Sequence, residues 1–183
     1  MALDHAILVS LAERSASGYD LARRFDKSIG FFWKATHQQI YKVLSRMESA
    51  GWVESTTVEE PGRPAKKVYA LTDDGRAELT RWTAEPTPIE SVRSDFAVKV
   101  RAMNFGDRDA VIADIARQRD RHLGRLAYYE ADCTKHFPEP DSLTASELPA
   151  YLVLRGGIRT EQTYIEWCDE MLAALGTDPE DQR

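Results

Sequence analysis

The chain has few cysteines, no long apolar run and no basic leader segment. Its two cysteines, Cys133 and Cys168, lie far apart in segments with helical periodicity, which favours buried, reduced thiols over a disulfide. No apolar run approaches the ~20 residues that a membrane-spanning helix needs, and Asp4 stands where a secretory signal would have positive charge. We therefore expect a cytoplasmic protein with one large or two small domains in its 183 residues.

The sequence also lacks the motifs of common enzymes. Its four histidines are scattered, and there is no H-E-x-x-H, no paired C-x-x-C, no Walker-type loop and no G-x-G-x-x-G after a strand. Acids that are adjacent in sequence, such as Asp73 and Asp74, point to different faces of a helix and suit capping or solvent. We therefore expect no catalytic site, no metal and no cofactor.

The acidic charge is unevenly distributed along the chain. The net charge is −6, but residues 1–85 hold twelve Lys or Arg and twelve Asp or Glu, so the acidic excess falls in residues 86–183. DNA affinity depends on charge at the contact surface rather than on the total, so a DNA partner is not excluded. The cations of the N-terminal part concentrate at Lys34, Lys42, Arg46, Arg63, Lys66 and Lys67.

The segment from Thr36 to Ser49 has the periodicity of a helix with one buried face, set by Ile40, Val43, Leu44 and Met47. Its opposite face has amide, hydroxyl and cationic groups, and no acid occurs before the last turn. Gln, Arg and Lys side chains suit base edges and phosphates. A polar outer face is common to surface helices, so this helix alone does not distinguish DNA binding from plain solvent exposure.

A glycine and two β-rich runs follow this helix. Gly51 stands where a glycine commonly ends a helix, and strands are expected over 52–58 and 67–72, joined by a Pro-Gly turn and basic residues. Two shorter helices precede it, over 3–13 and from Ser17, where Ser17 and Asp20 form a capping-box pattern. This order of elements favours a recognition helix followed by a basic β-wing.

The remainder of the chain has helical periodicity. A helix is expected after Thr72, and the Pro-Thr-Pro sequence at 86–88 marks a linker. The sequence allows two starts for the last helix. Thr144 and Glu147 form a capping-box pattern that would begin it there, whereas a start near Leu148 would place a proline in its first turn.

We predict a mainly α (α+β) fold with two domains. The predicted parts are a winged helix-turn-helix DNA-binding domain at 1–85, a linker at 86–94, a C-terminal antiparallel helical dimerisation domain at 95–176 and a tail at 177–183.

Two long helices with apolar seams favour a homodimer, because no third helix of similar length is available to cover them. The alternative is packing against the N-terminal domain. A Gly156–Gly157 pair would permit close approach of another helix. The predicted dimerisation residues are Ile112, Ile115, Leu126, Tyr129, Tyr151, Leu154, Ile158, Ile165 and Leu172.

The sequence resembles the PadR family of bacterial transcriptional regulators. The resemblance lies in residues 17–21 (SGYDL), 39–44 (QIYKVL), 47–53 (MESAGWV), 61–64 (PGRP) and 67–72 (KVYALT). It implies a cytoplasmic winged-helix repressor that binds a palindromic operator on double-stranded DNA as a homodimer and is released by an effector. The expected DNA-binding residues are Tyr19, Lys34, Thr36, His37, Gln38, Gln39, Tyr41, Lys42, Arg46, Arg63, Lys66 and Lys67.

Effectors in this family are small and often aromatic, and the sequence contains aromatic residues that could line a pocket for one. The alternative is that these residues belong to the core or the dimer seam, since aromatics dominate buried packing. The candidates are Trp33, Trp82, Tyr128, Tyr164 and Trp167. A protein-interaction module that keeps the winged-helix fold without touching DNA is the alternative function.

Overall fold

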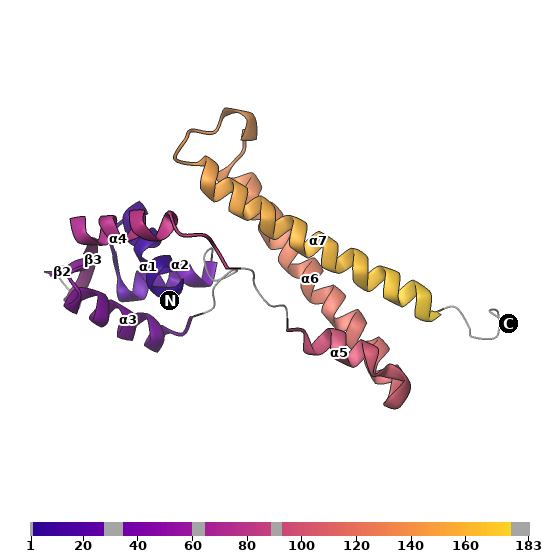
Figure 1. Cartoon of the computed structure of the whole chain (residues 1–183). Coiled ribbons are helices and arrows are strands. Elements are labelled where there is room, and N and C mark those ends of the chain that lie inside the picture. Colours follow the sequence, from indigo (N-terminus) through magenta and orange to yellow (C-terminus); the bar gives the residue numbers. More distant parts are fainter. Residues whose placement is uncertain (1, 28–34, 60–64, 89–92, 177–183) are drawn as a thin grey trace. The chain divides into compact units, whose positions relative to one another are not determined.

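The computed structural model describes residues 2–27, 35–59, 65–88 and 93–176. The chain divides into two compact units, Met1–Glu90 and Ser91–Arg183 (Figure 1). Unit 1 combines short helices with a small antiparallel sheet, and unit 2 is helical. The predicted mainly α (α+β) class is confirmed. No helix in the described ranges combines the length and the apolar character needed to cross a membrane.

Unit 1 has the element order of a winged helix. Its elements are α1 (Ala2–Glu13), β1 (Ala16–Ser17), α2 (Gly18–Lys27), α3 (His37–Ser49), β2 (Val53–Val58), β3 (Lys66–Leu71) and α4 (Asp73–Thr83). The strands form an antiparallel sheet in the order β1-β3-β2, in which Ala16 is opposite Tyr69 and Tyr69 is opposite Ser55. The two-residue strand β1 was not expected from the sequence.

The core of unit 1 forms where α1, α2 and α3 pack on one another and on the sheet. The predicted inner face of α3 is confirmed, because Ile40, Leu44 and Met47 have no exposed surface and Val43 is 7% exposed. The other buried apolar side chains of this core are Ile7, Leu8, Leu11, Ala16, Leu21, Ala22, Phe25, Val53 and Tyr69. Burial of one face of α3 leaves its other face directed outward.

Local hydrogen bonds fix both ends of α3. Thr36 and Gln39 form a capping box in which the Thr36 hydroxyl accepts from the Gln39 backbone N–H and the Gln39 side chain accepts from the Thr36 backbone N–H. Gly51 follows the C-terminal cap with φ of 76°, a conformation that favours glycine. The sequence-based boundaries of this helix are therefore confirmed.

A polar contact joins α1 to α4. His5 Nε2 lies 2.9 Å from Glu78 Oε1, and the Arg81 guanidinium donates to both Glu78 oxygens. The His5 ring also stacks on Trp82, with centroids 4.4 Å apart. The hydrogen bonds from Arg81 and then from His5 lower the pKa of Glu78 to about 2.

Unit 2 is built on two long antiparallel helices. Its elements are α5 (Asp95–Arg101), η2 (Met103–Phe105), α6 (Arg108–His136), η3 (Pro140–Ser142) and α7 (Leu148–Gly176). The helices α6 and α7 lie side by side (Figure 1). The helix α7 begins at Leu148, with Pro149 in its first turn. The hydrogen bonds expected of the alternative start also form, since the Glu147 carboxylate accepts from the Thr144 backbone N–H and hydroxyl.

The seam between α6 and α7 is apolar at one end and polar at its middle. Ile115 and Cys168 are fully buried against Met103. Further along, His122 is hydrogen-bonded to Glu161, and both side chains are buried. Cys133 and Cys168 are free thiols; Cys168 is buried, as expected, whereas Cys133 is half-buried. Burial raises the pKa of Cys168.

Part of the predicted dimerisation set lies inside this seam. Ile115, Tyr129, Ile158 and Ile165 are buried within a single chain, because α6 and α7 cover each other's apolar faces. Ile112 and Leu172 pack against the same core, while Leu126, Tyr151 and Leu154 are half-buried. A single chain is therefore sufficient to bury these four residues, and the role of the predicted set in dimerisation stays a prediction.

We predict that Gly75→Ala destabilises unit 1. A Cβ at Gly75 would lie 2.2 Å from the Trp52 carbonyl oxygen and 2.7 Å from Leu71 Cδ1, so the loss should be about 1–3 kcal/mol. Gly124→Ala is the control, because no heavy atom lies within 4 Å of its Cβ position and alanine favours a helix by about 0.5–1 kcal/mol. Thermal unfolding measures both. Equal stability of Gly75→Ala and the unsubstituted protein would contradict the packing.

We also predict that Glu78 stabilises the folded protein at neutral pH and that this stabilisation is lost in acid. Because its pKa is lowered from 4.5 to about 2 in the folded protein, its contribution is present above pH 4.5 and is lost as the pH falls towards 2. We expect Glu78→Gln to lower the free energy of unfolding by on the order of 2 kcal/mol at pH 7, allowing for screening of the exposed Arg81. This difference between the two proteins should shrink in acid. Urea unfolding across pH tests this. A cost independent of pH would contradict the assignment.

Candidate nucleic-acid interface

The outer face of α3 presents polar side chains to solvent. His37, Gln38, Tyr41, Lys42 and Ser45 are exposed, and Tyr41 retains 48% of its surface. They offer imidazole, amide, phenol, ammonium and hydroxyl groups without a carboxylate among them. Such groups donate hydrogen bonds to phosphates and to the acceptors on base edges.

The N-terminus of α2 lies against this face. A Cβ at Gly18 would lie 2.3 Å from Tyr41 Cε1, so only glycine allows the Tyr41 ring to pack this closely. The neighbouring Tyr19 is 57% exposed, and the Arg23 guanidinium lies 6.0 Å from its ring centroid. Tyr19 and Tyr41 therefore lie on neighbouring parts of the surface, and their contact with DNA stays a prediction.

Two members of this surface were not found from the sequence. Gly18 was noted only within the motif at residues 17–21, and Arg23 was not considered. The contact between Gly18 and Tyr41 joins different helices and leaves no local pattern. Arg23 could have been found, because it lies one helical turn after Tyr19 and shares its exposed face.

Gln39 and Thr36 have a structural role that limits their availability. The Gln39 side-chain oxygen accepts from the Thr36 backbone N–H at 2.8 Å and from its hydroxyl at 3.2 Å. Both residues are exposed, but the capping box uses the Gln39 oxygen. Of the two glutamines at the start of α3, Gln38 is the one whose amide is outside this cap.

The base of the wing is attached to α3 by an ion pair. Lys67 Nζ lies 2.8 Å from Glu48 Oε2, and Ser55 on β2 also donates to Glu48. The hydrogen bond from Lys67, followed by that from Ser55, lowers the pKa of Glu48, and the Glu48 carboxylate raises the pKa of Lys67. Lys67 therefore holds the strands to α3, and exposed Lys66 precedes it.

Arg46 forms an ion pair within unit 1. Its guanidinium pairs with Asp4 of α1, whose side chain is 7% exposed, while the Arg46 side chain is 58% exposed. A buried carboxylate is costly without a paired cation, so this pair stabilises the contact between α1 and α3. The role of Arg46 in DNA binding stays a prediction.

Four of the predicted aromatic residues are described, one in unit 1 and three in unit 2. Trp82 belongs to unit 1, where it stacks on His5. In unit 2, Tyr164 stacks on His122 at 4.5 Å, and Trp167 lies edge-on to Phe96 at 5.5 Å. These three contacts fit the alternative of structural packing. Tyr128 is exposed, with its ring 6.3 Å from that of its neighbour in α6.

Three predicted site residues, Lys34, Arg63 and Trp33, lie outside the described residues. Among the residues that the structure describes, no three His, Cys, Asp or Glu side chains are grouped to hold a metal ion. The functional surface of unit 1 is therefore the exposed face of α3, with the start of α2 beside it and the base of the wing attached to it.

Both units match known family models. Residues 7–81 match the transcriptional regulator PadR-like family, and residues 92–176 match the C-terminal domain of virulence activator alpha. These matches follow the division of the chain into its two units.

The chain is similar over nearly its whole length to named bacterial regulators. It is 49% identical over 185 residues to the probable transcriptional regulator Rv1176c of Mycobacterium tuberculosis, covering 96% of this chain and 98% of the relative. It is 30% identical to the negative transcriptional regulator PadR of Bacillus subtilis, with the same coverage.

Solved structures agree with this assignment. The B. subtilis PadR complex with operator DNA has a TM-score of 0.84 at 29% identity, covering 96% of this chain and 99% of that one. The same protein in complex with p-coumaric acid has a TM-score of 0.79, again at 29% identity and with the same coverage. The family expectation of a regulator rather than an enzyme is confirmed. The chain belongs to the PadR-like family of transcriptional regulators.

Proposed function

We propose that the protein is an effector-responsive repressor that binds a palindromic operator as a homodimer through the outer face of α3. The observation that supports this most is the exposed, acid-free surface formed by Gln38, Tyr41 and Lys42. It is held outward by the buried face of the same helix. Double-stranded DNA matches this surface in charge and in its hydrogen-bond acceptors.

The proposed contacts fall into two kinds. Gln38, Tyr41 and Lys42 approach base edges in the major groove, where their donors and acceptors distinguish sequences. Tyr19, Arg23 and Lys66 approach the phosphates and set the position of the domain. The pair formed by Lys67 and Glu48 fixes the wing relative to α3, so that both kinds of contact form together.

Repression and effector release rest on the relatives. B. subtilis PadR is a negative regulator with structures in complex with operator DNA and with p-coumaric acid. By similarity, we infer that this protein also represses and that a small effector changes its operator affinity. Repression of the promoter it binds, relieved by a small molecule, is the expected behaviour in a reporter assay.

The homodimer is supported by exposed apolar residues on unit 2. Leu152 and Val153 of α7 retain 58% and 54% of their surface, and the helical period places Leu152 on the opposite side of α7 from the buried Glu161. Phe105 is 92% exposed. Contact with a second copy would cover this apolar surface, and two-fold symmetry suits two operator half-sites.

We predict that Gln38→Ala changes operator preference while Lys66→Ala weakens binding uniformly. A base contact contributes about 1–3 kcal/mol of discrimination, whereas loss of one phosphate contact lowers the salt-dependence slope by about one unit. Binding to a randomised duplex library and to one operator at several salt concentrations measures both effects. Gln162→Ala on α7 serves as the control. Unchanged preference in Gln38→Ala would remove this residue from the proposed interface.

We also predict that Leu152→Asp weakens dimerisation. The substitution places a charge in an apolar contact, which should shift the dimer–monomer equilibrium by about tenfold or more. Gln162→Asp is the matched control, because Gln162 is an exposed polar residue of the same helix. Sedimentation velocity over a range of concentrations gives the dissociation constants. A Leu152→Asp protein as dimeric as the control would exclude this face of α7 from the dimer contact.

A further inference from the structure

Gly18, the first residue of α2, makes a very close contact with the recognition helix α3. A Cβ at Gly18 would lie 2.8 Å from Cζ of Tyr41 and 3.0 Å from its Cδ1, and Cε1 would be nearer still. Carbon atoms in contact are normally about 3.5–4.0 Å apart. One edge of the Tyr41 ring therefore occupies the space that a side chain at position 18 would fill.

The backbone conformation at Gly18 does not itself require glycine. Within the part of the chain that the structure describes, the glycine with a positive φ is Gly51. Gly18 begins a helix, where alanine is more favourable than glycine. The requirement for glycine at this position thus comes from the contact with Tyr41.

The start of α2 is held in place by its neighbours. The Ser17 hydroxyl accepts from the Asp20 backbone N–H at 3.1 Å and donates to the Asp20 carboxylate at 2.7 Å. In the sheet, Ser17 is opposite Val68 of the wing strand β3. Gly18 follows Ser17 directly, so its position relative to the wing is fixed through one backbone neighbour.

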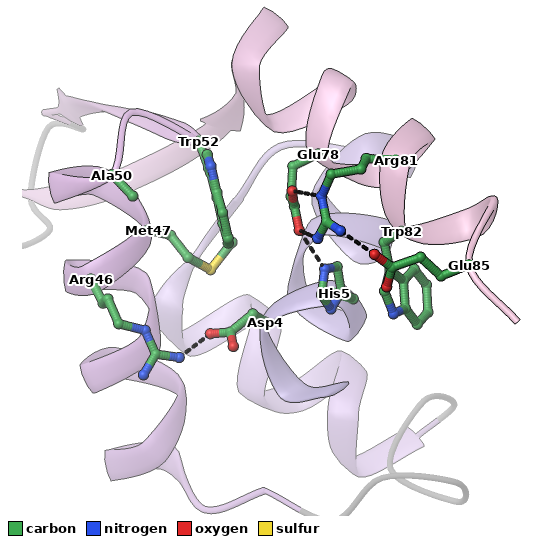
Figure 2. Close-up of a pocket in the computed structure, with 10 residues that line it drawn as sticks. All are labelled: Asp4, His5, Arg46, Met47, Ala50, Trp52, Glu78, Arg81, Trp82 and Glu85. Carbon is green, nitrogen blue, oxygen red and sulfur yellow. Dashed lines mark hydrogen bonds and ion pairs between the residues drawn. The ribbon is translucent and has the colours of Figure 1, made fainter. Parts of the chain in front are cut away.

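The recognition helix is also held in place, from two sides. Arg46 pairs with Asp4 of α1 (Figure 2), and Glu48 pairs with the base of the wing. The Tyr41 side chain, in contrast, retains 48% of its surface. If a methyl group were added at position 18, the part free to move would be the Tyr41 ring rather than either helix.

We propose that Gly18 is a positioning residue that determines operator specificity through Tyr41. This inference rests on the proposed function, in which Tyr41 approaches base edges. Gly18 has no side chain to offer to DNA, but it lets the ring lie against α2 in one direction relative to the wing. An added methyl group would turn the ring to another staggered rotamer and carry its hydroxyl away from the base edge.

The sequence preference of three full-length variants tests the proposal on a randomised duplex library. Gly18→Ala should lose about tenfold in discrimination at the same base position that Tyr41→Ala affects. The double variant should match Tyr41→Ala, because two residues that act through one contact are not additive. Gly124→Ala is the matched control, since no heavy atom lies within 4 Å of its Cβ position. Additive effects at different base positions would overturn the inference.

The position of the ring is measured in the same proteins without DNA. Two-dimensional ¹H–¹³C spectra of protein with ring-labelled tyrosine contain the Tyr41 signal, which is identified by its loss in Tyr41→Phe. This signal should shift in Gly18→Ala and stay unchanged in Gly124→Ala. If Gly18→Ala does not fold, the double variant with Tyr41→Ala should fold, because the ring that meets the methyl group is gone. A double variant that also fails to fold would overturn the inference.

The two measurements separate this inference from the proposed function. If Tyr41→Ala alters the sequence preference while Gly18→Ala changes neither the preference nor the Tyr41 signal, the inference fails and the proposed function stands. If Tyr41→Ala leaves the preference unchanged, the proposed base contact fails, and the role of Gly18 in specificity fails with it.

Discussion

Burial of one face of α3 is the constraint on which the rest of the structure depends. Ile40, Leu44 and Met47 lose all their exposed surface in the core of unit 1, and burial of each large apolar side chain contributes roughly 1.5–3 kcal/mol. Rotation of α3 about its axis would expose these residues and bury the ammonium group of Lys42, which is costly without a paired anion. The core therefore determines which side chains of α3 face outward and are available for the proposed DNA contacts.

Contacts from other elements convert this single helix into a wider surface. Gly18 allows α2 to approach Tyr41, and Glu48 holds Lys67 of the wing. The same C-terminal end of α3 also contacts α1 through Arg46 and Asp4. The helix is consequently attached to α1, to α2 and to the wing, which fixes the proposed DNA contacts relative to one another.

Local features of the sequence were sufficient to predict most of unit 1. The periodicity and caps of α3 depend on residues close together in the chain, and the predicted boundaries agree with the structure. The strand β1 was missed because two residues have no detectable alternation and depend on pairing with distant Tyr69. Apolar seams in α6 and α7 were predicted, but periodicity does not reveal which partner covers them. Ile115 and Ile158 are buried within one chain, and exposed Leu152 was not anticipated as a contact.

Photo-crosslinking from α3 to DNA tests the central claim most directly. A benzophenone amino acid placed at Tyr41 should crosslink to duplex DNA from the protein's own upstream region, and the modified bases should lie at two symmetric positions. The same group at Thr160 of α7, which is also exposed, should give no crosslink. Crosslinking at Thr160 with none at Tyr41, in a protein that retains its affinity, would contradict the account.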